Sequence, residues 1–191
     1  MKKLRQLFLI SVLVMVSTVV YSESYTGGQP VNPQPESSAL SPGLSIRYFF
    51  DYFNHIDEVS RKTEGSGREG EPLMNIDHNT INGKVLTADR PMGVGAHIRG
   101  FIKLEQTGNY VFRVESNDGV RVHIAGIKIW TDPEIHGNRW SRPLEYEVKT
   151  PGWYELHIDY YQRKGTSALK FAWTLPGSSE EEIVPASALA H

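Results

Sequence analysis

Residues 113–124 read RVESNDGVRVHI, and this stretch decides the fold. On both sides of Asn117-Asp118-Gly119 the apolar and polar side chains alternate residue by residue. An alternation with period two predicts β-strands that have one buried face and one wet face. The three residues between the strands are of the types that tight turns favour, which predicts a hairpin turn. The carboxylate at the tip, Asp118, is also a candidate for a ligand-binding role.

The same alternation continues through most of the chain after residue 43. It is clearest in NYVFRVE (109–115), VRVHI (120–124), WYELHIDYY (153–161) and LKFAWTL (169–175). Further strands are expected at Leu44–Phe53, His97–Leu104, Ile127–Thr131 and Leu144–Lys149. Gly-containing turns separate these segments, as in Ala125-Gly126 and Lys164-Gly165. Many short strands joined by such turns predict an all-β fold, an antiparallel two-sheet sandwich or barrel.

Two segments, Asn54–Asn79 and Asp132–Pro143, are too polar or too irregular to be read as strands. They are expected to be long loops. Long loops on a rigid β scaffold are where binding residues tend to lie, so both segments are candidates for a binding site.

The first 22 residues resemble a targeting segment rather than part of the fold. Three basic side chains, Lys2, Lys3 and Arg5, precede an uncharged apolar run of 14 residues that ends at Val20, followed by Ser22. This pattern is typical of a secretory signal peptide cleaved near Ser22, which predicts a secreted or periplasmic protein. The alternative is an uncleaved N-terminal anchor, although a spanning helix needs about 20 apolar residues.

Residues 23–42 read ESYTGGQPVNPQPESSALSP and are rich in Pro, Gly, Ser and Gln. This composition predicts a flexible linker, so that one folded domain begins near residue 43 and extends to residue 191. The sequence contains no cysteine, which excludes disulfides and a cysteine-linked lipid anchor. The net charge is −2, and without the three basic residues of the first 22 it becomes −5. A mildly acidic chain is a poor generic nucleic-acid binder.

Several stretches in order resemble a known module. They are GLSIRYFF (43–50), HIRGFIKLEQTGNYVFRVESNDGVRVHIAGIKI (97–129), TPGWYELHIDYYQRKGTSALKFAWTLPG (150–177) and IVPASAL (183–189). Together they resemble the protective-antigen domain family (PA-fourteen), a module shared with flocculin-type adhesins and some glycosidases. The likeness covers the chain from residue 43 to its end. It implies a β-barrel-like double sheet and, usually, a binding role without catalysis.

The resemblance also implies a candidate metal site. In glycan-binding members of the family, two successive Asp residues and a later Asn hold a calcium ion. The matching positions here are Asn117, Asp118 and a position at or near Gln162, so that one of the three residue types is retained. Calcium prefers six to eight oxygen ligands, several of them charged. A weak calcium site is therefore one expectation, and a plain turn without any metal is the other.

A sugar site is the second candidate. Trp140 lies in TDPEIHGNRWSRP (131–143) close to His136, Asn138 and Arg139. An aromatic ring beside hydrogen-bonding side chains suits a sugar, because the ring stacks on the apolar sugar face while polar groups bind its hydroxyls. The alternative is that Trp140 folds back as a buried lid over one end of the barrel.

No motif of a catalytic centre is found in the sequence. The seven histidines form no His-Glu-x-x-His motif, and no Gly-x-Ser-x-Gly elbow occurs. Acidic runs such as Glu180–Glu182 are typical of solvated surface. The chain is therefore interpreted as a binding module rather than an enzyme, with no cofactor required.

Three functions remain open at this point. The first is binding of a glycan or cell-envelope polysaccharide, favoured if the Asp132–Pro143 loop and the turn at Asn117 converge on one concave, polar pocket. The second is binding of an exported protein partner, favoured by a flat exposed apolar patch. The third is a small glycosidase-like enzyme, which would need two carboxylates about 5–10 Å apart across a cleft.

The leader generates the first prediction. If residues 1–22 are a cleaved signal peptide, N-terminal sequencing of the exported protein will begin at Glu23 or within a few residues of it. A protein that keeps Met1 and sediments with membranes would show that the segment is an anchor instead.

Overall fold

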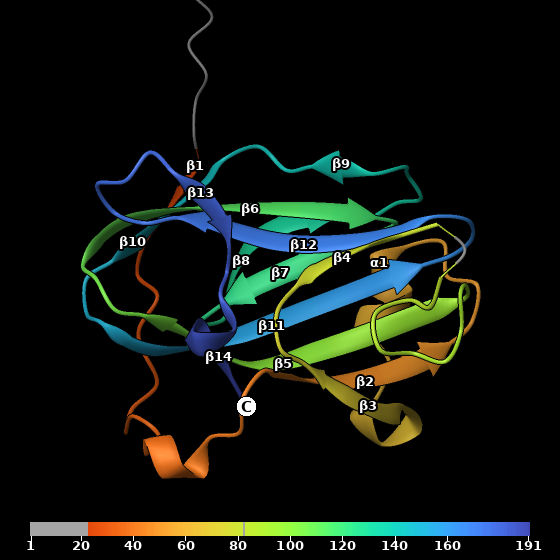
Figure 1. Ribbon diagram of the computed structural model, residues 1–191, viewed down its shortest axis with the longest axis horizontal. Coiled ribbons are helices and arrows are strands. Elements are labelled where there is room, and N and C mark those ends of the chain that lie inside the picture. The colour runs from red at the N-terminus through yellow and green to blue at the C-terminus, as the bar shows by residue number, and fades with distance from the viewer. Residues whose placement is uncertain (1–22, 82) are drawn as a thin grey trace, which may run out of the picture.

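The computed structural model describes residues 23–81 and 83–191, so the predicted signal peptide lies outside the described residues. Two β-sheets face each other and form a sandwich (Figure 1). Sheet A has the order β1 (Glu23–Tyr25), β10 (Leu144–Val148), β6 (Gly108–Asn117), β12 (Ser167–Thr174), β13 (Glu181–Ile183), with β4 (Asp77–Thr80) beside β12 and β9 (Arg139–Trp140) beside β6. Sheet B has the order β3 (Arg68–Leu73), β2 (Leu44–Phe50), β5 (Val94–Leu104), β11 (Gly152–Gln162), β7 (Val120–Ile124), β8 (Ile127–Asp132), with β14 (Leu189–Ala190) beside β5.

Helices are few and short. They are η1 (Ser37–Ala39), α1 (Ile56–Ser60), η2 (Glu64–Ser66) and η3 (Ala186–Ala188). None of the helices in the described part of the chain is long and apolar enough to cross a membrane. All strand pairs are antiparallel except β1 with β10. The predicted all-β, antiparallel two-sheet fold is confirmed.

The core lies between the sheets and consists of the side chains that the period-two pattern assigned to the inner faces. Tyr110, Phe112 and Val114 of β6 are buried, as are alternate residues of β11 and β12. Phe112 stacks on Phe171 with ring centroids 5.2 Å apart. Trp173, expected in the core, is only 5 % exposed.

The chain crosses between the sheets more often than a set of hairpins would. β6 belongs to sheet A and β7 to sheet B, so Asn117-Asp118-Gly119 joins the two sheets and the predicted hairpin at this point is wrong. The strands on either side pair with other neighbours, β6 with β10 and β12, and β7 with β11 and β8. The expected turn at Ala125-Gly126 does close a hairpin, between β7 and β8, and both residues have positive φ.

Both predicted long loops contain structure that the pattern did not reveal. Residues 54–79 hold α1, η2, β3 and the first part of β4, and residues 132–143 hold β9. These strands lie at sheet edges or beside them, and β3 and β4 expose much of both faces. An edge strand that buries neither face needs no apolar alternation, so the sequence showed none.

Residues 23–42, expected to be a flexible linker, contact the rest of the domain at several points. β1 pairs with β10, and Tyr25 packs against the core. Further along, Gln34 Oε1 accepts the N–H of Trp153 at 2.7 Å, and the N–H of Val31 donates to the Trp153 carbonyl at 2.9 Å. Polar residues can hold a segment through such bonds without adding to the core, which composition alone does not show.

This packing predicts that the segment stabilises the domain. A chain of residues 43–191 should melt about 4–8 °C below one of residues 23–191, because several hydrogen bonds at about 0.5–1.5 kcal/mol each are lost. Thermal unfolding followed by circular dichroism measures the difference. Equal melting temperatures would show that residues 23–42 are a passive tether.

Candidate functional site

Four connections meet at one end of the sandwich, here named the loop end. They are residues 51–55 after β2, 117–119 between β6 and β7, 133–138 after β8, and 163–166 between β11 and β12. The strand register places them together, because the end of β6 pairs with the start of β12, and the end of β11 pairs with the start of β5. In Figure 1 this end lies on the right-hand side, where the arrowheads of β6, β11 and β2 point.

The Asn117-Asp118-Gly119 connection is fastened to β11. The Asp118 N–H donates to the Tyr161 carbonyl at 3.0 Å, and the Tyr161 N–H donates to the Gly119 carbonyl at 2.9 Å. The Tyr160 hydroxyl donates to the Asn117 carbonyl at 2.6 Å. The peptide bond between Asn117 and Asp118 is cis, and neither residue has a positive φ. The connection is therefore a fixed bridge between the sheets and not a turn of the positive-φ type.

The Asp118 carboxylate points inward and is 3 % exposed as a residue. Its Oδ1 accepts the backbone N–H of His136 at 3.1 Å, and its Oδ2 accepts the backbone N–H of Arg163 at 2.7 Å. Burial raises the pKa of Asp118 above its ordinary value, and the two N–H donors offset part of this rise. The carboxylate thus joins the 133–138 and 163–166 connections to the bridge between the sheets.

The Asn117 side chain makes a second link between the same connections. Its Nδ2 donates to Asn138 Oδ1 at 2.9 Å and to Thr166 Oγ1 at 2.8 Å. Asn138 is exposed and Thr166 is half-buried, so the outer ends of this link border the surface. The two candidate sets of the sequence, one around Asn117 and one in the 132–143 loop, therefore meet here.

Gln162 is fully buried at the last position of β11. Its Nε2 donates to the carbonyls of Gly165 at 3.3 Å and of Thr166 at 3.1 Å. The side chain thereby closes the 163–166 connection on itself. Its Oε1 is buried without a hydrogen-bond partner among the described residues.

The donor set at Asn117, Asp118 and Gln162 does not fit a calcium ion. One carboxylate supplies all the charge, and both of its oxygens already accept backbone N–H groups. Asn117 and Gln162 direct amide N–H groups, rather than oxygens, at the neighbouring oxygen atoms. Calcium is bound by several charged and neutral oxygens together. Among the described residues, no group of three or more His, Asp or Glu side chains is arranged to hold a metal ion.

The structure separates the predicted sugar-binding residues. His136 and Asn138 lie at the loop end as described. Arg139 turns away to pair with the Asp132 carboxylate, with Nε 2.6 Å from Oδ2. Trp140 sits on β9 opposite Glu115, on the outer face of sheet A, with the guanidinium of Arg113 4.9 Å from its ring centroid. Trp140 thus lies on the outer face of sheet A and not over the end of the barrel.

Sequence reasoning missed the aromatic residue that the loop end does expose. Tyr52, in the connection after β2, is 48 % exposed, and the Lys164 ammonium lies 5.4 Å from its ring centroid. The chain beside it is fixed by the N–H of Gly93, which donates to the Arg163 carbonyl at 3.0 Å. Ile135, next to His136, is 51 % exposed. The available signal was an aromatic residue directly after a strand that ends near the bridge.

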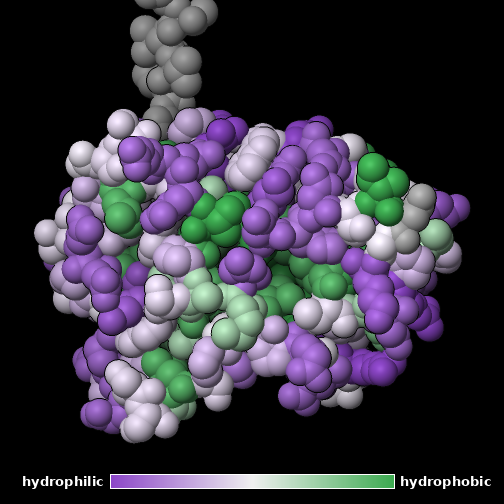
Figure 2. All heavy atoms as spheres, viewed as in Figure 1, coloured by the Kyte–Doolittle hydropathy of each residue, from purple (hydrophilic) through white to green (hydrophobic). Residues whose placement is uncertain are grey.

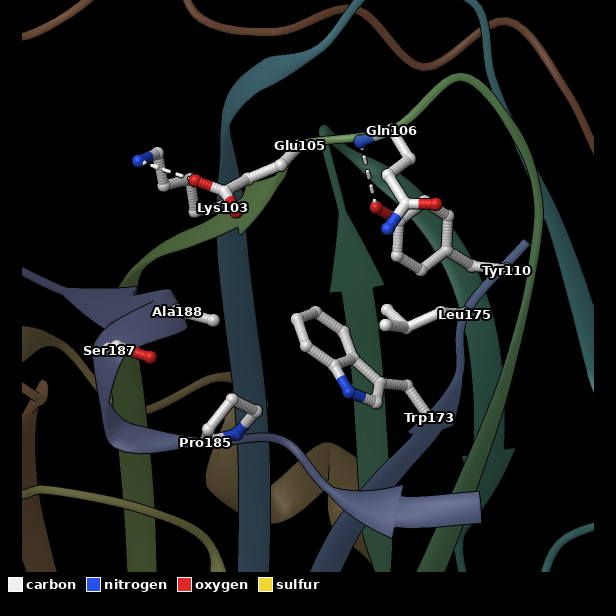
Figure 3. A pocket seen from close by; sticks show the side chains of 9 residues that line it. All are labelled: Lys103, Glu105, Gln106, Tyr110, Trp173, Leu175, Pro185, Ser187 and Ala188. Atoms are coloured by element: carbon white, nitrogen blue, oxygen red, sulfur yellow. Dashed lines mark hydrogen bonds and ion pairs between the residues drawn. The ribbon is translucent and has the colours of Figure 1, made fainter. Parts of the chain in front are cut away.

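Figure 2 shows one face that is mostly hydrophilic, with hydrophobic side chains in a hollow near its centre and in smaller groups toward both ends. A separate pocket of about 280 Å³ opens at the opposite end of the sandwich (Figure 3). Trp173 and Tyr110 form its apolar wall, and the ion pair of Lys103 with Glu105, 2.7 Å long, lies at its rim beside Gln106. None of the predicted site residues lines it.

Comparison with known proteins shows which proteins share this architecture. The family model of the PA14 domain matches residues 40–187. Among solved structures, the PA14 domain of the MpAFP antifreeze protein is similar at 16 % identity, with 85 % of this chain and 96 % of that chain covered and a TM-score of 0.66. The PA14 sugar-binding domain from an RTX adhesin is similar at 18 % identity, covering 78 % and 98 %, with a TM-score of 0.61. The Epithelial Adhesin 9 A domain from Candida glabrata, in complex with Galb1-4GlcNAc, is similar at 13 % identity, covering 85 % and 94 %, with a TM-score of 0.63.

At these identities the solved structures establish the fold alone. The comparison with curated proteins gave no match.

The two hydrogen bonds that the Asp118 carboxylate accepts from backbone N–H groups generate a stability prediction. Asp118→Ala should lower the free energy of unfolding by about 1–3 kcal/mol for each buried N–H left without a partner. Asp89→Ala is the matched control, because its exposed ion pair with Arg68 is worth about 0–1 kcal/mol. Chemical denaturation measures both. An equally small loss in the two variants would show that the carboxylate does not hold the connections together.

Proposed function

The chain belongs to the PA14 domain family, and on this premise we propose that it is a non-catalytic carbohydrate-binding module whose loop end contacts the sugar. The proposal includes export, on the ground of the leader pattern in residues 1–22. The ligand class is a glycan or a cell-envelope polysaccharide.

One observation carries the proposal: the connections 117–119, 133–138 and 163–166 are tied to each other through Asn117 and Asp118. Loops that are fixed to one another before a ligand arrives lose little conformational freedom on binding, which favours affinity. Catalysis is not needed to explain such an arrangement.

The exposed groups around this centre suit a sugar. Tyr52 offers a ring face on which the apolar side of a pyranose can stack. Lys164, Asn138 and Thr166 offer an ammonium, an amide and a hydroxyl as partners for sugar hydroxyls. In this proposal Tyr52 takes the stacking role that the sequence assigned to Trp140.

The neighbouring structures support the same class of ligand. The RTX adhesin domain is described as sugar-binding. The Epithelial Adhesin 9 and 6 A domains were each solved in complex with Galb1-3GlcNAc.

A glycosidase-like activity is less well supported. Such an enzyme needs two carboxylates that face a substrate across a cleft. Asp118 is occupied by two backbone amides, and Asp132 is paired with Arg139 and lies 3.2 Å from His136 Nε2. Neither carboxylate is free to act as an acid or a nucleophile.

A protein partner is the second candidate function, and exposed apolar side chains at the loop end favour it. Tyr52, Ile135 and Met92 are 48 %, 51 % and 39 % exposed. Exposed apolar side chains that gather in one region mark interaction sites in other proteins.

The test of the proposal is a glycan array followed by titration of the best ligand. Tyr52→Ala and Asn138→Ala should each weaken sugar binding about tenfold, equivalent to about 1.4 kcal/mol, with little change in melting temperature. Trp140→Ala should leave the affinity unchanged, because Trp140 lies on the outer face of sheet A.

Gln106→Ala is the matched control at the opposite pocket. If Gln106→Ala weakens binding and Tyr52→Ala does not, the sugar sits in the pocket of Figure 3 and not at the loop end. Failure of every glycan to bind would favour the protein-partner function.

A further inference from the structure

The amide of Gln162 occupies the centre of the 163–166 connection. Its Nε2 has two acceptors, the carbonyls of Gly165 and Thr166, which curl back toward the end of β11. The residue has no exposed surface. Carbonyl groups that converge in this way repel one another unless a donor or a cation lies between them.

Asn117 completes the arrangement from the other sheet. Its Nδ2 donates to oxygens of two different connections, on Asn138 and Thr166. Opposite these amides, Asp118 accepts N–H groups from the same two connections. The oxygens of Gly165, Thr166 and Asn138 are thus supplied with N–H donors by the chain itself, whereas Gln162 Oε1 has no partner among the described residues.

We propose that Gln162 and Asn117 together take the place of a cation, so that their N–H groups hold the 163–166 and 133–138 connections in order without calcium. Gln162 is in this sense a positioning residue for the loop end. That these ordered connections serve sugar binding rests on the proposed function. Whether they are ordered without calcium can be measured in the absence of any sugar.

The charge balance favours amides over an ion at this point. A divalent cation would be opposed by a single carboxylate, Asp118, and would have to displace two N–H donors from Gln162 and Asn117. Arg163 and Lys164 add positive charge within the 163–166 connection itself. Two neutral amides supply N–H donors to the oxygens of Gly165, Thr166 and Asn138 without adding charge.

The experiment compares melting temperatures and hydrogen exchange of residues 162–167 in millimolar calcium and in chelator. The wild type should show the same melting temperature and the same protection in both. A rise of several degrees with calcium in the wild type would overturn the proposal, whatever the variants do.

The variants test the amides directly. Gln162→Met keeps the length of the side chain and removes both donors, so exchange in residues 162–167 should rise by tenfold or more in calcium and in chelator alike. Unchanged protection would overturn the proposal. Gln106→Glu, at the opposite end of the sandwich, is the control for the Gln162→Glu change used in the double variant below. It should alter neither the melting temperature nor the exchange of residues 162–167.

Asn117→Asp combined with Gln162→Glu replaces two donors by two carboxylates. This double variant should become calcium-dependent, with a low melting temperature in chelator that calcium restores by binding the folded state. If the double variant is insensitive to calcium, a cation does not fit between these side chains. The proposal that the two amides take the place of a cation would then be wrong. Sugar binding is read separately, so its absence would count against the proposed function and not against the amide arrangement.

Discussion

Everything at the loop end depends on the burial of one face of each strand. The apolar side chains of β6 and β12 in sheet A pack against those of β11, β5 and β7 in sheet B. A chain that alternates between two packed sheets must cross from one to the other at their ends. The crossings after β6 and after β11 fall at the same end, which brings Asn117 and Asp118 to the 163–166 connection. The hydrogen bonds of Asp118 then fix an arrangement that the packing has already brought within reach.

The sequence predicted the parts of the fold that are governed by this burial. The strands with apolar alternation were found with nearly the right bounds, since a face that packs on the core must be apolar at every second residue. The strands β1, β3, β4, β9, β13 and β14 were missed because they are short or polar and lie toward the margins of the sheets, where no such demand applies. The hairpin expected at Asn117 was wrong for a related reason: a turn-like tripeptide does not reveal whether the next strand joins the same sheet.

The candidate site was predicted in part. Asn117, Asp118, Gln162, His136 and Asn138 do lie together, although their contacts are hydrogen bonds within the chain. Trp140 was misplaced because β9 returns to pair with β6, and this pairing turns its side chain onto the outer face of sheet A. Tyr52 was overlooked because residues 44–53 were read as one strand, whereas β2 ends at Phe50 and leaves Tyr52 in the connection that follows. Which side chains face a ligand is decided by loop conformation, and loop conformation is set by contacts between residues that are distant in sequence.

The positions of the chain ends and of the loop end determine how a pulling force would act on the domain. Ser41 and His191 exchange two backbone hydrogen bonds, of 2.7 and 2.9 Å, so the start and the close of the domain are clamped together next to β14. This clamp lies at the end of the sandwich away from the loop end, because β2 runs from Leu44 near the clamp to Phe50 near Tyr52. A pull between a ligand held at the loop end and this clamp would therefore act along the strands. The hydrogen bonds of antiparallel strand pairs run perpendicular to the strands, so such a pull loads the bonds of one pair side by side and not one after another.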